Sequence, residues 1–117
     1  MTPNKVMEQV DAKRPNTYTE EDKMKWINDV DGMVQKLVIK KDEIEQYKFP
    51  EDGDRELLIP FPFDSVYEFY VEAMMDFNNR EYSNYNNSLA MFSTQFEEYR
   101  KAYIREHMPK SAGHFKM

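Results

Sequence analysis

Side chains that commonly carry acid–base or metal chemistry are scarce in this sequence. It has no cysteine, and its two histidines, His107 and His114, both lie close to the C-terminal end. A catalytic histidine needs neighbours that orient it and shield it from water. Because both lie outside the periodic apolar segments of the chain, we interpret them as solvated residues of a helix end and a tail. The lack of cysteine excludes disulfides and thiolate chemistry.

Two short acidic segments have spacings that approach those of cation sites. Residues 29–32 (Asp-Val-Asp-Gly) share part of an EF-hand loop pattern, but they lack its other ligands and lie inside a helical pattern. We interpret them as a solvated helix face. Residues 51–54 (Glu-Asp-Gly-Asp) form either a hydrated loop or a weak cation site. Since GxxxxGK[ST], GxGxxG and HExxH motifs are also absent, we expect no enzymatic activity, no metal and no cofactor.

The length and composition fit one folded domain. The 117 residues carry a net charge of −6 and include 8 Tyr, 8 Phe and 9 Met, whereas disordered chains are poor in aromatic residues. No apolar run approaches the ~20 residues of a membrane span, and we expect no signal peptide. An acidic pI near 4.9 argues against non-specific nucleic-acid binding, which requires basic residues facing phosphates.

The first predicted helix runs from Pro3 to about Lys13. Thr2 is a suitable N-cap, and proline at the first helical position loses no hydrogen bond because that N–H has no partner in a helix. The helix is expected to stop at Arg14, since the following Pro15 disfavours α geometry there.

The second predicted helix begins after Thr19, whose side chain can cap it, and three acidic residues follow in the first turn. Gly32 inside this helix costs about 1 kcal/mol relative to alanine, so we expect a packing reason or a bend there. Apolar residues recur along one face at helical spacing, namely Trp26, Ile27, Val30, Met33, Val34 and Leu37.

Two irregular segments separate this helix from the next. Residues 42–56, the acidic loop, contain Pro50 and Gly53 and are typical of a loop. Residues 57–63 (Leu-Leu-Ile-Pro-Phe-Pro-Phe), the arm, must be extended because the alternating prolines exclude a helix and a central strand. The arm either staples the helices internally or is partly donated to another subunit. Its candidate contact residues are Leu58, Pro60, Phe61, Pro62 and Phe63.

The third helix is predicted to open at Asp64 or Ser65, with Ser65 and Glu68 forming a capping box. It is expected to stop at Asn78-Asn79, since asparagine tolerates left-handed geometry. One apolar stripe runs along it, formed by Val66, Phe69, Tyr70, Ala73, Met74 and Phe77.

The fourth helix shows the clearest periodicity. Its seam follows an a/d pattern through three heptads and ends before Pro109, with the members Tyr82, Tyr85, Leu89, Phe92, Phe96, Tyr99 and Tyr103. The seam faces the core of the domain or, in part, a neighbouring chain. The short break before it makes helices three and four an antiparallel hairpin. We therefore predict an all-α fold, a small bundle of about four helices with a long hairpin and an extended arm. A single domain spans 1–109, and 110–117 form a flexible tail.

Five segments, in order along the chain, resemble one family of phage proteins. They are residues 15–21 (Pro-Asn-Thr-Tyr-Thr-Glu-Glu), 26–27 (Trp-Ile), 57–64 (the arm and Asp64), 85–88 (Tyr-Asn-Asn-Ser) and 107–110 (His-Met-Pro-Lys). The sequence resembles head-tail connector proteins, also called head-completion or adaptor proteins, of tailed phages and prophages of Gram-positive bacteria. The resemblance covers residues 2–110, and none of its motifs is catalytic.

The resemblance implies an α-helical structural virion protein without catalysis or cofactor. It implies assembly at the portal vertex, between the portal protein and tail-attachment or stopper proteins, as a homo-oligomeric ring such as a dodecamer. A monomer in solution before assembly is compatible with this. The location is then the head-tail interface of the virion, and the host cytoplasm during assembly, with non-specific DNA passage and no membrane contact.

The charge distribution fits such a ring. Residues 41–99 carry four basic and fourteen acidic residues, whereas residues 100–117 carry five basic and one acidic. Such regions can supply the two different faces of a head-to-tail contact, and an acidic surface suits a channel through which DNA slides. We hypothesise that the acidic loop, or the outer face of the third helix, borders the channel, with Asp52, Asp54 and Glu56 as candidates. The alternative is a stand-alone helical protein-binding module, such as a phage regulator or host-interacting protein. A small metal- or nucleotide-dependent enzyme has the least support.

Overall fold

The first helix, α1 (Pro3–Lys13), has the predicted bounds and cap. The computed structural model describes residues 1–107. The Thr2 hydroxyl accepts a hydrogen bond from the Lys5 amide at 3.2 Å. The buried face of α1 is formed by Val6, Met7 and Val10. The predicted tail at 110–117 and His114 lie outside the described residues.

The second helix, α2 (Glu20–Met33), is capped as predicted by Thr19, which accepts from the Asp22 amide at 3.0 Å. It passes Gly32 without a break, and a Cβ added there would meet nothing within 4 Å. The structure therefore offers no packing reason for Gly32. The departure from α geometry comes two residues later, where α2 continues as a π-helix, η1 (Val34–Ile39). It ends at Lys40, which has left-handed geometry (φ 63°).

Residues 40–65 cross the bundle without a helix or strand, as predicted for the acidic loop and the arm. The third helix, α3 (Val66–Asn78), starts just after the predicted position, and the expected capping box does not form because the Ser65 side chain makes no capping bond. The physical reason is the backbone of Ser65, which already has helical geometry (φ −63°, ψ −15°). A capping side chain reaches the first turn from an extended backbone.

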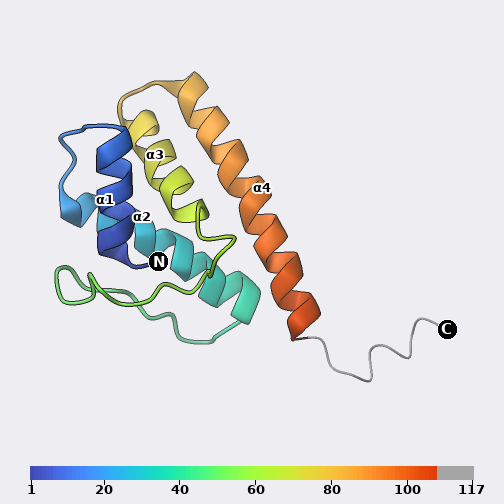
Figure 1. Cartoon of the computed structure of the whole chain (residues 1–117). Coiled ribbons are helices and arrows are strands. Elements are labelled where there is room, and N and C mark those ends of the chain that lie inside the picture. Colours follow the sequence, from blue (N-terminus) through green and yellow to red (C-terminus); the bar gives the residue numbers. More distant parts are fainter. Residues whose placement is uncertain (108–117) are drawn as a thin grey trace.

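The fourth helix, α4 (Tyr82–Glu106), packs antiparallel along α3, and together they form the predicted hairpin (Figure 1). Rings from the two helices meet, Tyr70 with Phe92 at 5.0 Å and Phe77 with Tyr85 at 5.2 Å between centroids. The hairpin turn takes its left-handed residue at Arg80 (φ 61°) rather than at an asparagine. The α4 seam lies against the bundle, where Phe92 and Tyr99 are buried and Tyr82 at its start is exposed.

Helix α3 is the centre of the fold, between α1 and α2 on one side and α4 on the other (Figure 1). Opposite the predicted stripe it buries a second apolar set, Tyr67, Val71 and Met75. Two acidic residues of α3 are also buried and paired with α1 or its end. Glu68 bonds the Lys13 ammonium at 3.0 Å, and Asp76 binds the Arg14 guanidinium at 2.5 and 3.2 Å. The described residues thus form an all-α bundle, as predicted, with four α-helices and no strand.

Within residues 1–107, no helix is long and apolar enough to cross a membrane.

Candidate protein-binding surfaces

The arm is fastened to the bundle by its backbone at three successive residues. The Leu57 amide donates to the Met1 carbonyl at 2.9 Å, the Leu58 amide to the Asp31 carboxylate at 3.1 Å, and the Ile59 amide to the Tyr67 hydroxyl at 2.8 Å. The side chains of Leu57 and Ile59 are buried in the core. The first half of the arm is therefore an internal staple.

The carboxylate of Asp31 is the centre of this attachment. It is 1% exposed and also accepts hydrogen bonds from the hydroxyls of Tyr47 and Tyr67. Burial raises the pKa of Asp31 above its usual range, and these hydrogen bonds oppose the rise. The interpretation of Asp31 as part of a solvated helix face is wrong, since this side chain joins α2, the acidic loop, the arm and α3.

The second half of the arm is exposed. Phe61 keeps 84% of its surface accessible, and Pro60, Pro62 and Leu58 are exposed as well. On its far side the arm is held again. The Pro62 carbonyl accepts from the Gln95 side chain at 3.0 Å, and the half-buried Phe63 ring lies 6.1 Å from Tyr99. The arm therefore presents a Pro60-Phe61-Pro62 tip between two fixed ends. Of the five predicted contact residues, only Phe63 is part of the internal packing.

The three acidic channel candidates each fasten the acidic loop. Asp52 accepts from the Lys48 amide at 2.7 Å, Asp54 from the Asn4 side chain at 3.0 Å, and Glu56 pairs with the N-terminal ammonium at 2.5 Å. Asp54 and Glu56 are exposed, and Asp52 is half-buried. Their role toward DNA stays a prediction, and the structure assigns them a local role in addition.

The described part of the chain contains no cluster of side chains that could bind a metal ion, and its one histidine is exposed. Residues 1–107 hold no group of three or more His, Asp or Glu side chains that could bind a metal ion. His107 is exposed at the end of α4, where its ring stacks on Tyr103 at 3.9 Å between centroids. This agrees with its interpretation as a solvated helix-end residue.

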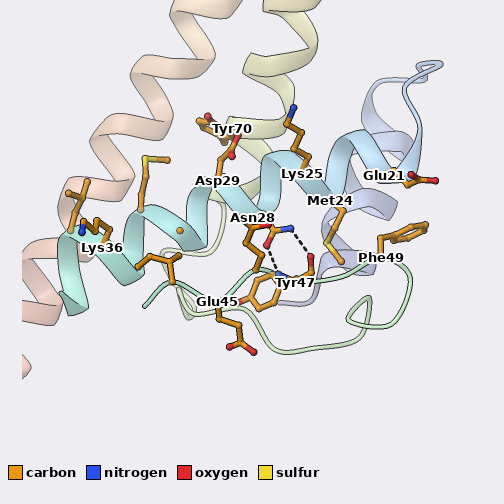
Figure 2. A pocket seen from close by; sticks show the side chains of 15 residues that line it. Glu21, Met24, Lys25, Asn28, Asp29, Lys36, Glu45, Tyr47, Phe49 and Tyr70 are labelled. Carbon is orange, nitrogen blue, oxygen red and sulfur yellow. Dashed lines mark hydrogen bonds between the residues drawn. The ribbon is translucent and has the colours of Figure 1, made fainter. Parts of the chain in front are cut away.

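A cleft of about 760 Å³ lies between α2 and the acidic loop (Figure 2). Gly32 contributes only its backbone to the cleft, and Tyr70 of α3 also lines it. Its apolar lining comes from Met24, Met33, Leu37, Ile44 and Phe49. One of these residues, Leu37, is 58% exposed. We call the cleft between α2 and the acidic loop the α2 cleft.

The loop wall of the α2 cleft is held by two amide side chains of the helical segment. Asn28 donates to the Tyr47 carbonyl at 2.9 Å and accepts from the Tyr47 amide at 2.6 Å (Figure 2). Gln35 does the same with Glu45, at 2.9 and 2.8 Å. Arg55 supports this wall, since its guanidinium lies 5.1 Å from the Tyr47 ring centroid and pairs with Glu45. The cleft is therefore bordered by a fixed loop.

Two features of the other border are unusual. Leu37 and Lys36 belong to the π-helix η1. A π-helix is rare in proteins, and where one occurs it is frequently at a functional site. Asp29 and Tyr70 lie side by side there. Burial raises the pKa of Asp29, and burial together with the Asp29 charge raises the pKa of Tyr70 to about 12. Sequence patterns did not predict this cleft, because its loop wall is held by Asn28 and Gln35 through bonds to residues 19 and 10 positions away.

No protein-family model, curated protein or solved structure matches this chain. The resemblance to head-tail connectors therefore stays a prediction from the sequence motifs.

Proposed function

We propose that this chain is a structural subunit of a tailed-phage virion, a head-tail connector or head-completion protein that links head to tail without catalysis. Its partners are then the portal protein, the tail-attachment or stopper proteins, and further copies of itself in a ring. The motifs quoted above support the family, and the exposed arm tip supports a role in assembly.

The observation that carries the proposal is the arm tip. Phe61 is 84% exposed, whereas the Ile59 amide before the tip and the Pro62 carbonyl at its end are bonded to the bundle. An exposed aromatic side chain between backbone groups that are bonded to the bundle is typical of a surface that a partner covers, since aromatic residues are enriched at the centres of interfaces. In a protein that assembles with others, such a tip can serve as a contact surface.

The acidic loop has a proposed role at the DNA channel. Reversing the charges of Asp52, Asp54 and Glu56 is expected to slow or block DNA exit from the virion. Since these side chains also fasten the loop, the control is a set of neutral variants, Asp54→Asn and Glu56→Gln, which keep oxygen acceptors. Unchanged ejection in the reversed variant would contradict a role at the channel.

A stand-alone protein-binding module is the second candidate, and the α2 cleft favours it. A cleft of about 760 Å³ with a largely apolar lining is within the size range of ligand sites, roughly 300–1,000 Å³. Such a module would bind a host protein and have no place in the virion.

Deletion of the gene from its inducible prophage or phage separates the two functions. After induction, the lysate is imaged by electron microscopy. Separated heads and finished tails, or heads that have lost their DNA, are expected for a connector. Intact infectious particles would contradict this proposal and support the binding module.

A further inference from the structure

We propose that the acidic loop and the arm open together as one unit, because both are bonded to the buried carboxylate of Asp31. The inference goes beyond the proposed function and applies to a connector and to a binding module alike. It couples the α2 cleft, which Tyr47 of the loop lines, to the exposed arm tip.

A single oxygen of Asp31 joins the two segments. Its Oδ2 accepts hydrogen bonds from the Tyr47 hydroxyl of the loop and from the Leu58 amide of the arm. The other oxygen, Oδ1, accepts from the Tyr67 hydroxyl, which in turn accepts from the Ile59 amide. One carboxylate therefore holds the loop and the first half of the arm at the same time.

The chain between Tyr47 and Leu58 does not make this link by itself. It is fastened elsewhere, at the start of α1, where the Gly53 carbonyl accepts from the Asn4 amide at 2.9 Å. The direct connection between the loop and the arm is therefore the Asp31 carboxylate rather than the continuity of the chain. Coupling between two segments requires such a physical contact with each of them.

The bond between Asp31 and the arm depends on the exclusion of water. Asp31 forms no ion pair within residues 1–107, so its hydrogen bonds are what compensate for the burial of its charge. Tyr47 is buried beside it. When Tyr47 leaves, water reaches the carboxylate and competes with the Leu58 amide for the same oxygen, and the bond also loses its low-dielectric surroundings. Opening of the loop therefore loosens the arm.

Tyr47 lies where a partner in the α2 cleft would meet it. It lines that cleft and also a smaller cavity of about 90 Å³, which Leu58 and Arg55 line as well. Its backbone is held by Asn28 (Figure 2). A partner that displaced Tyr47 from the cleft wall would release the arm, and by linkage a partner that pulled on the arm tip would open the cleft.

Hydrogen exchange of single amides, measured by NMR on the full chain, tests the coupling from loop to arm. Asn28→Ala removes the two bonds that hold the backbone of Tyr47. We expect the Leu58 and Ile59 amides to exchange at least about tenfold faster, relative to the amide of Val71. The Val71 amide serves as the reference for global unfolding, because Val71 is buried in α3.

The matched control is Asn16→Ala. The Asn16 side chain also bonds two backbone groups, at 2.8 and 3.1 Å, but it lies between α1 and α2. Asn16→Ala should change the exchange of the Leu58 amide, relative to that of Val71, by less than about twofold. Equal exchange of Leu58 in the two variants would overturn the proposal.

Coupling is reciprocal, so the same experiment is run from arm to loop. Tyr67→Phe frees the Ile59 amide, and the reporter is the Glu45 amide, which Gln35 holds at 2.8 Å. We expect Glu45 to exchange at least about fivefold faster relative to Val71. The control Gln95→Ala releases only the far end of the tip and should leave Glu45 within about twofold of the wild type. Unchanged exchange of Glu45 in Tyr67→Phe would overturn the proposal.

A measurement on the wild type alone completes the test and does not depend on how any variant folds. Exchange is followed at low urea concentrations, where the slope against urea reports the surface that an opening exposes. If the loop and the arm open as one unit, the Glu45, Leu58 and Ile59 amides share one slope and one opening equilibrium. Different slopes for Glu45 and Leu58 would show two separate openings and contradict the proposal.

Discussion

The hydroxyl of Tyr67 is expected to hold the arm on the bundle, and Tyr67→Phe removes only this oxygen. The hydroxyl is buried, donates to the Asp31 carboxylate at 2.5 Å and accepts from the Ile59 amide at 2.8 Å. A hydrogen bond to a charged group contributes about 1.5–3 kcal/mol, and a buried donor without a partner costs about 1–3 kcal/mol. Since the two hydrogen bonds belong to one network, their contributions do not add fully. We therefore expect Tyr67→Phe to lower the free energy of unfolding by about 3 kcal/mol.

Urea denaturation followed by the fluorescence of Trp26, the single tryptophan of the chain, measures this loss. The control is Tyr82→Phe, because Tyr82 is exposed and should change the free energy of unfolding by less than about 0.5 kcal/mol. Hydrogen exchange of the Ile59 amide should become much faster in Tyr67→Phe. A free energy of unfolding equal to that of the control would refute the account of the arm attachment.

Three further predictions concern single residues. Gly32→Ala should raise the free energy of unfolding by up to about 1 kcal/mol, since alanine favours the helix and its Cβ has open space; a lower midpoint in urea would contradict this. Arg14→Ala should lower the free energy of unfolding by about 2–3 kcal/mol, because it leaves the buried Asp76 carboxylate without its bidentate partner. Arg100→Ala, which removes an exposed ion pair, should change the urea midpoint far less. Asp31→Asn should remove a pH dependence. Burial raises the folded pKa of Asp31, so its contribution to stability falls as pH rises from the unfolded value, about 3.9, through the folded pKa. The stability of the wild type relative to Asp31→Asn should therefore decrease over that range in pH-dependent denaturation; an increase would contradict the assigned direction.

Local signals predicted much of the fold. The caps at Thr2 and Thr19 depend on residues within three positions, and both are present as predicted. The hairpin was also predictable, because the α4 seam is a long unbroken pattern. The cap of α3 was not, since the backbone of Ser65 already has helical geometry and its side chain makes no capping bond.

The apolar stripe of α3 did not predict that this helix is buried on two faces. The predicted stripe describes the face toward α4, while Tyr67, Val71 and Met75 form a second stripe at spacings of four residues. Helices that are apolar on both sides lie in the interior of a bundle. The signal is therefore present in the sequence, although a single stripe predicts only one buried face.

The arm attachment and the α2 cleft depend on residues far apart in the sequence. Asp31 meets Tyr47, Leu58 and Tyr67, which are 16 to 36 positions away. No local pattern distinguishes such a buried carboxylate from a solvated one. The cleft similarly requires the acidic loop to lie along α2, which Asn28 and Gln35 determine through backbone bonds.

Complementation of the deleted phage gene tests the central claim most directly, that the exposed arm tip is an assembly contact of the virion. The deletion strain is supplied with the wild type, Phe61→Asp or the control Met91→Asp, and infectious particles are counted after induction. Both side chains are exposed, so both variants should fold, as circular dichroism can verify. We predict that Met91→Asp restores particle numbers and that Phe61→Asp does not. Full restoration by Phe61→Asp would contradict the account.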